Sequence, residues 1–195
     1  FTGAIRDVSI SSMNRSKNVS FIKCRFYGGQ SMMLSDVDNV LLEGCSFYAD
    51  YMNSGIRRII TVDSPFNLRV INNFIDGRYP DNRYAIEIRG TAYDQSLFVN
   101  NVILSEASNT PNSAAILFGN AWGSMRNDIF AFNTIRFSSS NTSNSVFSSP
   151  NCSLTGTLMY NNIIVNESGG YIYDDCNYPT GYNLLYTTGA ISPQD

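Results

Sequence analysis

Two short alternating segments, Ile-Thr-Val-Asp63 and Ile-Glu-Ile-Arg89, carry the side chains best suited to chemistry. They bring Asp63, Glu87 and Arg89 together, with Arg58 just upstream, in a chain of which only 15% is charged. A guanidinium group binds a carboxylate through two parallel hydrogen bonds, so this set can bind or polarise an acidic sugar. The same residues can instead form an ordinary cross-strand ion pair on a solvated face.

If this site is catalytic, we expect Arg89, Asp63 and Glu87 to act, in lyase or hydrolase chemistry. The chain has no histidine, so the commonest general acid–base residue is missing. The vicinal acidic pair Asp174-Asp175 is poorly placed to flank a scissile bond, because alternation along a strand would turn its side chains to opposite faces. The sequence therefore leaves open whether the site cleaves a ligand or only binds it.

No cofactor is required by these residues, and calcium is the one metal that we consider. Asp63, Glu87 and Asp36 offer part of the set of oxygen ligands that calcium needs. Arg89 stands between them and would compete with a cation.

Aromatic residues in the flanking loops suit sugar binding, since sugar rings stack on aromatic faces. The alternative is that these aromatics cover the bases of the loops and the edges of the fold. With the neighbouring polar residues, the expected substrate-binding set is Thr61, Arg58, Tyr93, Trp122, Tyr79 and Tyr84.

A repeat must position all of these residues. Six times, a small polar residue precedes a large apolar one by two places, at intervals of 21 to 32 residues. A period of this size is typical of a stacked solenoid. The six pairs are Cys24/Phe26, Cys45/Phe47, Asn73/Ile75, Asn101/Ile103, Asn133/Ile135 and Asn162/Ile164.

Apolar residues also lie three and five places before the small residue, as Phe21 and Val19 do before Cys24, and this spacing indicates two strands joined by a tight bend. The small residue then points inward at the bend, where a stacked amide satisfies the backbone of its neighbours. A second inward series lies upstream, with one apolar residue in each coil. The residues around its members, such as Ile60-Thr-Val62-Asp, alternate between apolar and polar with period two, as half-buried strands do. This series is Leu34, Val62, Ile88, Phe118, Phe147 and Ile172.

These patterns predict an all-β fold, a right-handed parallel β-helix of about six to seven coils with three short strands per coil. We expect one domain over residues 1–195, cut from a longer protein, because the chain begins directly on a coil without a cap.

The Asn-Asn-x-Ile phrases around Asn73, Asn101 and Asn162 resemble those of the pectin-lyase-like superfamily of right-handed parallel β-helix proteins. The resemblance implies a polysaccharide site on the first sheet of each coil, on the strands that hold Asp63 and Arg89. The middle coils are similar to alginate-lyase-type β-helices, in which a Lys and an Arg on neighbouring coils act as base and acid. Arg89 matches that pattern, but Asp63 stands at the Lys position and Gly90 at a position usually held by His, so the mechanism lacks its base.

The segment from Asn162 through Cys176 to Leu185 resembles the terminal coils of large bacterial surface β-helix proteins. That resemblance implies a secreted or cell-surface location.

The amino-acid composition limits the kinds of partner that the protein can bind. The net charge of −3 argues against nucleic acid, which binds a basic surface. No apolar run approaches the roughly 18 residues of a membrane span. Further coils of the parent chain are a second expected partner, because the end coils are open.

The four cysteines form two pairs, Cys24 with Cys45 and Cys152 with Cys176, each separated by about one coil. Neighbouring strands are about 4.8 Å apart, which is within disulfide range. Each pair can therefore be a disulfide of an exported protein or two stacked free thiols.

The sequence thus favours a polysaccharide-directed extracellular module that binds, or also cleaves, an acidic glycan on the first sheet. The alternative is a non-catalytic surface adhesin or spacer.

Overall fold

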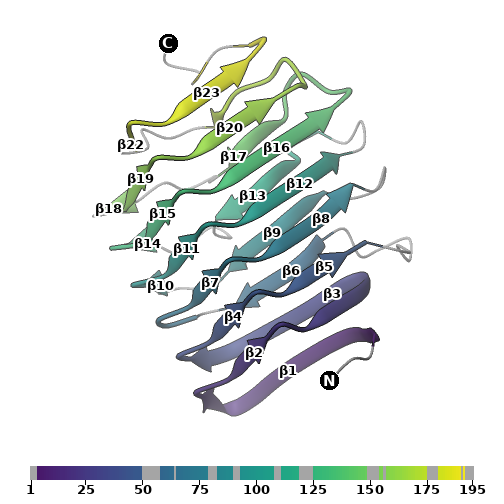
Figure 1. Cartoon of the computed structure of the whole chain (residues 1–195), viewed down its shortest axis with the longest axis vertical. Helices are drawn as coiled ribbons and strands as arrows, with labels where there is room; N and C mark the ends of the chain where they lie inside the picture. The colour runs from purple at the N-terminus through teal and green to yellow at the C-terminus, as the bar shows by residue number, and fades with distance from the viewer. Residues whose placement is uncertain are drawn as a thin grey trace.

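The computed structural model shows a parallel β-solenoid (Figure 1). The structure describes residues 4–49, 58–63, 65–78, 83–89, 93–107, 111–118, 125–148, 154–155, 157–174, 180–189 and 191. Within these ranges, the side chains of 4–16, 29–30, 93–94, 125–126, 154–155, 174 and 180 are not described. The described residues contain strands and turns but no helix, which confirms the all-β prediction.

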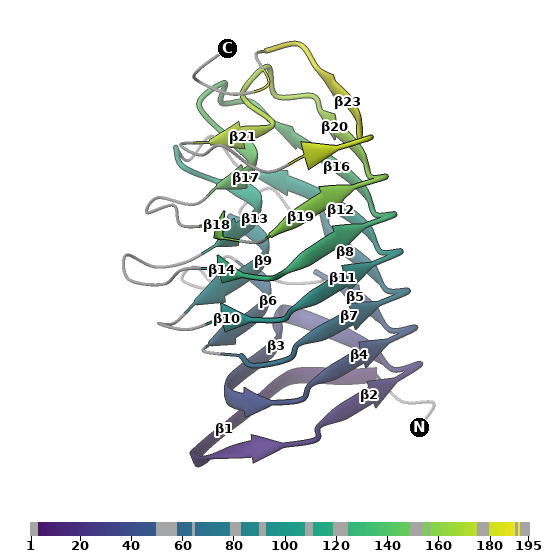
Figure 2. The same ribbon diagram turned by 90° about the vertical axis from the view of Figure 1, so that its left-hand side faces the viewer.

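One wall of the solenoid is a seven-stranded parallel sheet, seen as a stack in Figure 2. Each strand has only two or three residues, because the chain turns sharply after it. The strands are β2 (Ser20–Ile22), β4 (Leu41–Glu43), β7 (Arg69–Ile71), β11 (Leu97–Val99), β15 (Ile129–Ala131), β19 (Leu158–Tyr160) and β22 (Thr180–Gly181).

After the bend, the chain enters a second wall. It contains β5 (Ser46–Tyr48), β8 (Phe74–Arg78), β12 (Val102–Ala107), β16 (Thr134–Ser139), β20 (Ile163–Asn166) and β23 (Leu184–Thr187). We call the outer surface of these two walls, which meet at the bend, the bend face.

A third wall, here called the site wall, contains β6 (Arg58–Asp63), β9 (Tyr84–Arg89), β13 (Ala114–Phe118), β17 (Ser145–Ser148) and β21 (Tyr173–Asp174). The long strand β3 (Arg25–Asp38) joins the site wall to the second wall, so the two form one thirteen-stranded sheet, and β1 (Ala4–Lys17) pairs with β3. A small sheet of β10 (Tyr93–Asp94), β14 (Met125–Arg126) and β18 (Leu154–Thr155) completes the strands.

The inward asparagines at the bend form the predicted structural ladder. Asn101 is typical: its Nδ2 donates to the carbonyl oxygen of Val70 at 2.8 Å and to Oδ1 of Asn133 at 2.9 Å. Its Oδ1 accepts from the backbone N–H of Asn73 at 3.0 Å. Each buried amide therefore satisfies backbone groups that the bend removes from the sheet. The ladder also continues to Asn183, which the six pairs did not include.

Cys24 and Cys45 extend this ladder as free thiols, so the disulfide alternative is wrong for this pair. The Cys45 thiol donates to the carbonyl oxygen of Phe21 at 3.3 Å, and the backbone N–H of Cys24 donates to Sγ of Cys45 at 3.5 Å. The thiols thus make weaker versions of the Asn contacts. The pair Cys152 and Cys176 lies outside the described residues.

The core consists of stacked like residues. Phe26 lies on Phe47 with ring centroids 4.8 Å apart, and Phe98 lies on Phe130 at 4.4 Å. The inward series on the site wall is confirmed for Leu34, Val62, Ile88 and Phe118 by backbone pairing.

The predicted register of that series is wrong in the later coils. Phe147 pairs with Ile116 rather than Phe118, and Tyr173 rather than Ile172 pairs with Phe147. Phe147 and Ile172 are nevertheless buried in the core, as predicted, and Tyr173 is buried beside them. A displacement of two residues keeps Phe147 inward, so the apolar pattern alone does not exclude it.

The number of turns also differs from the prediction. Successive ladder residues between Cys45 and Asn162 are separated by 28, 28, 32 and 29 residues, and a short step of 21 residues lies at each end. The solenoid therefore has about four full-length turns rather than six to seven. The prediction rested on six copies of the bend phrase, and the first step between them, from Cys24 to Cys45, is one of the short ones.

In the part of the chain that the structure describes, no helix is long and apolar enough to cross a membrane.

Candidate functional site

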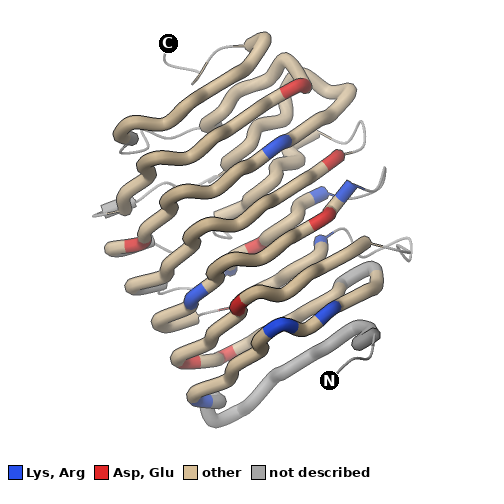
Figure 3. Tube along the Cα trace, in the orientation of Figure 1, with Lys and Arg blue, Asp and Glu red and all other residues tan. Residues whose placement is uncertain are grey.

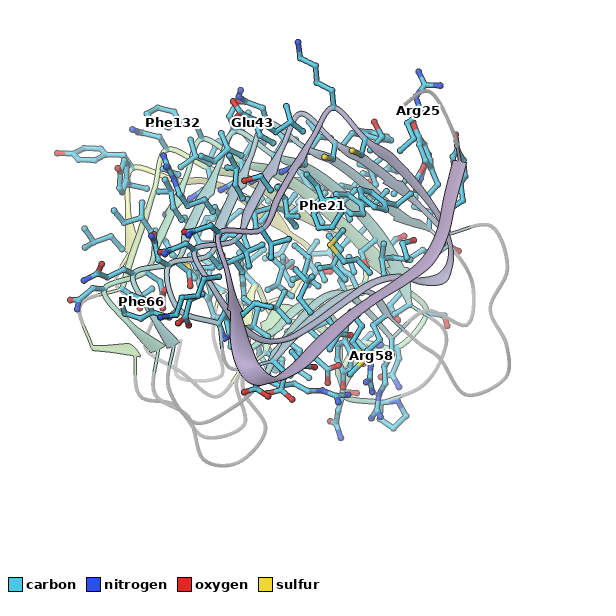
Figure 4. The ribbon with its side chains drawn as sticks, turned by 90° about the horizontal axis from the view of Figure 1, so that it is seen from below. Phe21, Arg25, Glu43, Arg58, Phe66 and Phe132 are labelled. Atoms are coloured by element: carbon cyan, nitrogen blue, oxygen red, sulfur yellow. The ribbon has the colours of Figure 1, made fainter. Side chains whose placement is uncertain are left out.

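Six of the predicted site residues lie on two adjacent strands of the site wall, β6 and β9. Backbone pairing places Thr61 beside Glu87 and Asp63 beside Arg89. Ile59 and Ile60 are both buried in the core, so strand β6 does not alternate strictly at its start. Because of this irregularity, Arg58 lies on the outside of the solenoid, as Figure 4 shows.

Two guanidinium groups meet at one carboxylate oxygen. Nε of Arg58 is 2.8 Å from Oε2 of Glu87, and Nη2 of Arg89 is 2.9 Å from the same atom. The Glu87 side chain is only 5% exposed, whereas those of Arg58 and Arg89 are 29% and 26% exposed. The carboxylate is therefore enclosed, and part of each arginine remains open to solvent.

Burial dominates the proton equilibrium of Glu87. It raises the pKa of the carboxyl group from 4.5 to about 7, although Arg58 and Arg83 act to lower it. Asp63 adds a smaller effect that raises the pKa further. Glu87 thus exchanges a proton near neutral pH, which is unusual for a carboxyl group.

A small apolar cluster encloses Glu87 on the outer surface of the wall. It consists of Tyr84, Ala114 and Leu117, all buried and separate from the main core. Leu117 pairs directly with Glu87 on the side away from Thr61. The cluster accounts for the desolvation of a carboxyl group that points away from the core.

Tyr84 is fixed in this cluster by its hydroxyl group. The hydroxyl donates to the carbonyl oxygen of Asn112 at 3.1 Å, and burial raises the pKa of Tyr84. The guanidinium carbon of Arg83 is 5.6 Å from the centre of the Tyr84 ring, within the range of a cation–π contact. Arg83 also donates to the carbonyl oxygen of Pro111 at 3.3 Å.

The structure therefore brings together six of the predicted residues and one that was missed. The missed residue, Arg83, precedes Tyr84 in a segment already expected to contact a sugar, and its charge was the available signal. Tyr93 lies in β10, where its side chain is not described, and Tyr79 and Trp122 lie outside the described residues. The residues on neighbouring positions of β6 and β9 are Arg58, Thr61, Asp63, Tyr84, Glu87 and Arg89.

Calcium does not suit this arrangement. Among the described residues, no group of three or more metal-ligating side chains is present. Two arginines also contact Oε2 of Glu87, and they would repel a cation at that oxygen.

The chemistry open to the site is anion binding. Three arginines, Arg58, Arg83 and Arg89, face two carboxyl groups, one of which is partly protonated near neutral pH. Positive charge is therefore in excess at a partly exposed surface, where a carboxylate or sulfate group of a ligand can pair with it.

No protein-family model matches the chain, and no curated protein or solved structure is significantly similar to it.

Proposed function

We propose that this protein binds an acidic polysaccharide on the outer surface of the site wall, through Arg58 and Arg89. The observation that carries the proposal is the convergence of two partly exposed guanidinium groups on one enclosed carboxylate oxygen. A ligand carboxylate can take the outward hydrogen-bonding positions of both arginines. The parallel strands repeat every 4.8 Å or so, which suits an extended polymer lying across the coils.

Binding without cleavage agrees best with the site. Glu87 is enclosed and paired with two arginines, and the chain contains no histidine. The Tyr84 hydroxyl donates a hydrogen bond to a carbonyl oxygen, and burial raises its pKa. Tyr84 is therefore a poor general base. Lyase or hydrolase activity of Arg89, Asp63 and Glu87 remains an alternative that the experiment below tests.

The proposal extends to family and location. A solenoid with an inward Asn ladder at the bend agrees with membership of the pectin-lyase-like superfamily and with a secreted or cell-surface protein. A surface adhesin or spacer is the second candidate function. The exposed apolar side chains on the bend face favour it, because large apolar surfaces are typical of protein contacts.

A glycan array that contains uronate, sulfated and neutral polymers tests the proposal, followed by a lyase assay on every polymer that is bound. We expect wild-type protein to bind uronate polymers without producing unsaturated products, and Arg89→Gln to lose most of that binding. Arg136→Gln is the matched control, because Arg136 also forms an exposed ion pair, with Glu167, but on the bend face. Equal binding by wild type and Arg89→Gln contradicts the proposal, and turnover by wild type establishes the enzymatic alternative.

A further inference from the structure

The bend face of the C-terminal coils has an exposed apolar surface that the proposed glycan site does not use. Six large side chains lie on it, each between 45% and 94% exposed. We call them the apolar patch: Phe132, Leu158, Ile163, Tyr182, Leu184 and Tyr186.

The patch is continuous across three coils. Thr134, Ile163 and Leu184 are backbone neighbours, as are Arg136, Val165 and Tyr186. Phe132 also makes an edge-on contact with Tyr160 of the next coil, with ring centroids 6.0 Å apart. Ile163 and Leu184 therefore adjoin each other, with Tyr186 two residues further along the same strand. Tyr160, which is not itself a patch residue, lies between Phe132 and Leu158.

Two residues of the patch adopt a backbone conformation that does not suit them. Phe132 has φ 57° and Tyr182 has φ 50°, in the left-handed region. The equivalent position holds Gly44, Asn72, Asn100 and Asn161 in four other coils, residue types that tolerate this region, and Lys23 in the first coil. An aromatic residue at this backbone conformation costs stability, and each of these two residues is more than half exposed to solvent.

Charge is also scarce on this surface. In Figure 3, the coils nearest the C-terminus carry few charged positions on the face turned to the viewer. Arg136 and Glu167, which flank the patch, already pair with each other at 2.9 Å. A partner that covers the patch would therefore not leave either charge of this ion pair without its counterpart. The apolar side chains of the patch also offer few hydrogen-bonding groups to a sugar.

The area of the patch matches a standard protein interface. With roughly 200 Å² for an aromatic side chain and somewhat less for Leu or Ile, the six residues expose on the order of 700 Å². A stable interface buries about 800 Å² on each partner. An uncharged patch is also complementary to itself, which is the requirement of a two-fold symmetric contact.

We propose that the apolar patch binds the same patch of a second copy of this chain and forms a two-fold symmetric dimer. Arg58 and Phe132 lie on opposite sides of the solenoid when it is viewed from below (Figure 4). The dimer therefore leaves both site walls exposed, facing away from each other, so one assembly presents two glycan sites.

Sedimentation equilibrium of the full chain over about 1 to 100 µM tests the dimer. We expect wild type to be dimeric in this range and the double variant Phe132→Asn, Tyr182→Asn to be monomeric. Asn is the natural residue at this position in other coils, so the variant should fold, and circular dichroism with thermal unfolding checks this.

Ile22→Asn is the control, because Ile22 is comparably exposed on the bend face but lies in the first coil, far from the patch. It should remain dimeric. A monomeric wild type over the whole range overturns the proposal, whatever other partner the patch has. A folded double variant that still dimerises also overturns it.

Discussion

Nε of Arg58 lies 2.8 Å from Oε2 of Glu87, although the two residues are not paired in the sheet. Arg58 is opposite Tyr84, and Glu87 is opposite Thr61, so the arginine reaches diagonally between neighbouring coils. Arg89 contacts the same oxygen from the same strand as Glu87. One enclosed carboxyl group thus holds two arginines in place on the outer surface.

Folding stability should fall as pH rises through the range in which Glu87 titrates. The folded chain keeps the Glu87 proton up to about pH 7, whereas the unfolded chain releases it near the ordinary pKa of 4.5. Wild type should therefore lose up to about 3 kcal/mol between these pH values relative to Glu87→Gln, which cannot ionise.

Urea unfolding of both proteins at about pH 5 and pH 8 measures this difference. Glu167→Gln is the control, since Glu167 forms an exposed ion pair with Arg136, and its difference from wild type should be nearly independent of pH. If the free energies of unfolding of wild type and Glu87→Gln differ by the same amount at both pH values, Glu87 is ionised in the folded chain throughout this range.

Acidic glycans should bind more tightly at lower pH. Protonation of Glu87 releases Arg58 and Arg89 from their internal partner, while a sugar carboxylate remains ionised. Affinity should therefore decrease from about pH 6 to pH 8 in wild type and stay level in Glu87→Gln. Titration calorimetry with an oligouronate checks this. A wild-type affinity that is independent of pH would contradict the idea that Glu87 and the sugar carboxylate compete for the two arginines.

The inward Asn ladder should carry much more stability than the outer one. Asn101→Ala leaves the carbonyl oxygen of Val70 and the backbone N–H of Asn73 without their partners, at a cost of about 3 kcal/mol or more. The adjacent Asn100→Ala loses only an exposed contact with Asn72 and some backbone preference, about 1 kcal/mol. Denaturant unfolding compares the two variants, and equal losses would show that the ladder is not the main support of the bend.

Cys45→Asn should be tolerated, because it extends the ladder by one coil. Its Nδ2 would replace the weak thiol donor to the carbonyl oxygen of Phe21, and its Oδ1 would accept from the backbone N–H of Cys24. We expect the free energy of unfolding to stay within about 1 kcal/mol of wild type or to rise. Cys45→Leu, which can make neither bond, should destabilise clearly; if Asn is as harmful as Leu, the site differs from its neighbours.

The sequence was sufficient for the fold because the solenoid repeats its own constraints. Each bend needs a small inward residue with hydrogen-bonding groups, so Asn73, Asn101 and Asn133 recur at a recognisable period. The register of β17 was not predictable in the same way, since a displacement of two residues leaves Phe147 inward.

The candidate site was predictable in position but not in geometry. Alternation placed Asp63, Glu87 and Arg89 on one face, and backbone pairing confirms that they lie on adjacent strands at neighbouring positions. The enclosure of Glu87 was not predictable, because it depends on Tyr84 and Leu117 in a small outer cluster. That cluster arises where β6 and its neighbours depart from strict alternation, and no periodicity in the sequence predicts this departure.

The most direct test of the proposed function is calorimetric titration of one oligouronate into wild type and into the double variant Arg58→Gln, Arg89→Gln at about pH 6. The double variant should bind at least about tenfold more weakly, while Arg136→Gln binds as wild type does. An unchanged affinity in the double variant, with all three proteins folded, would contradict glycan binding at the site wall.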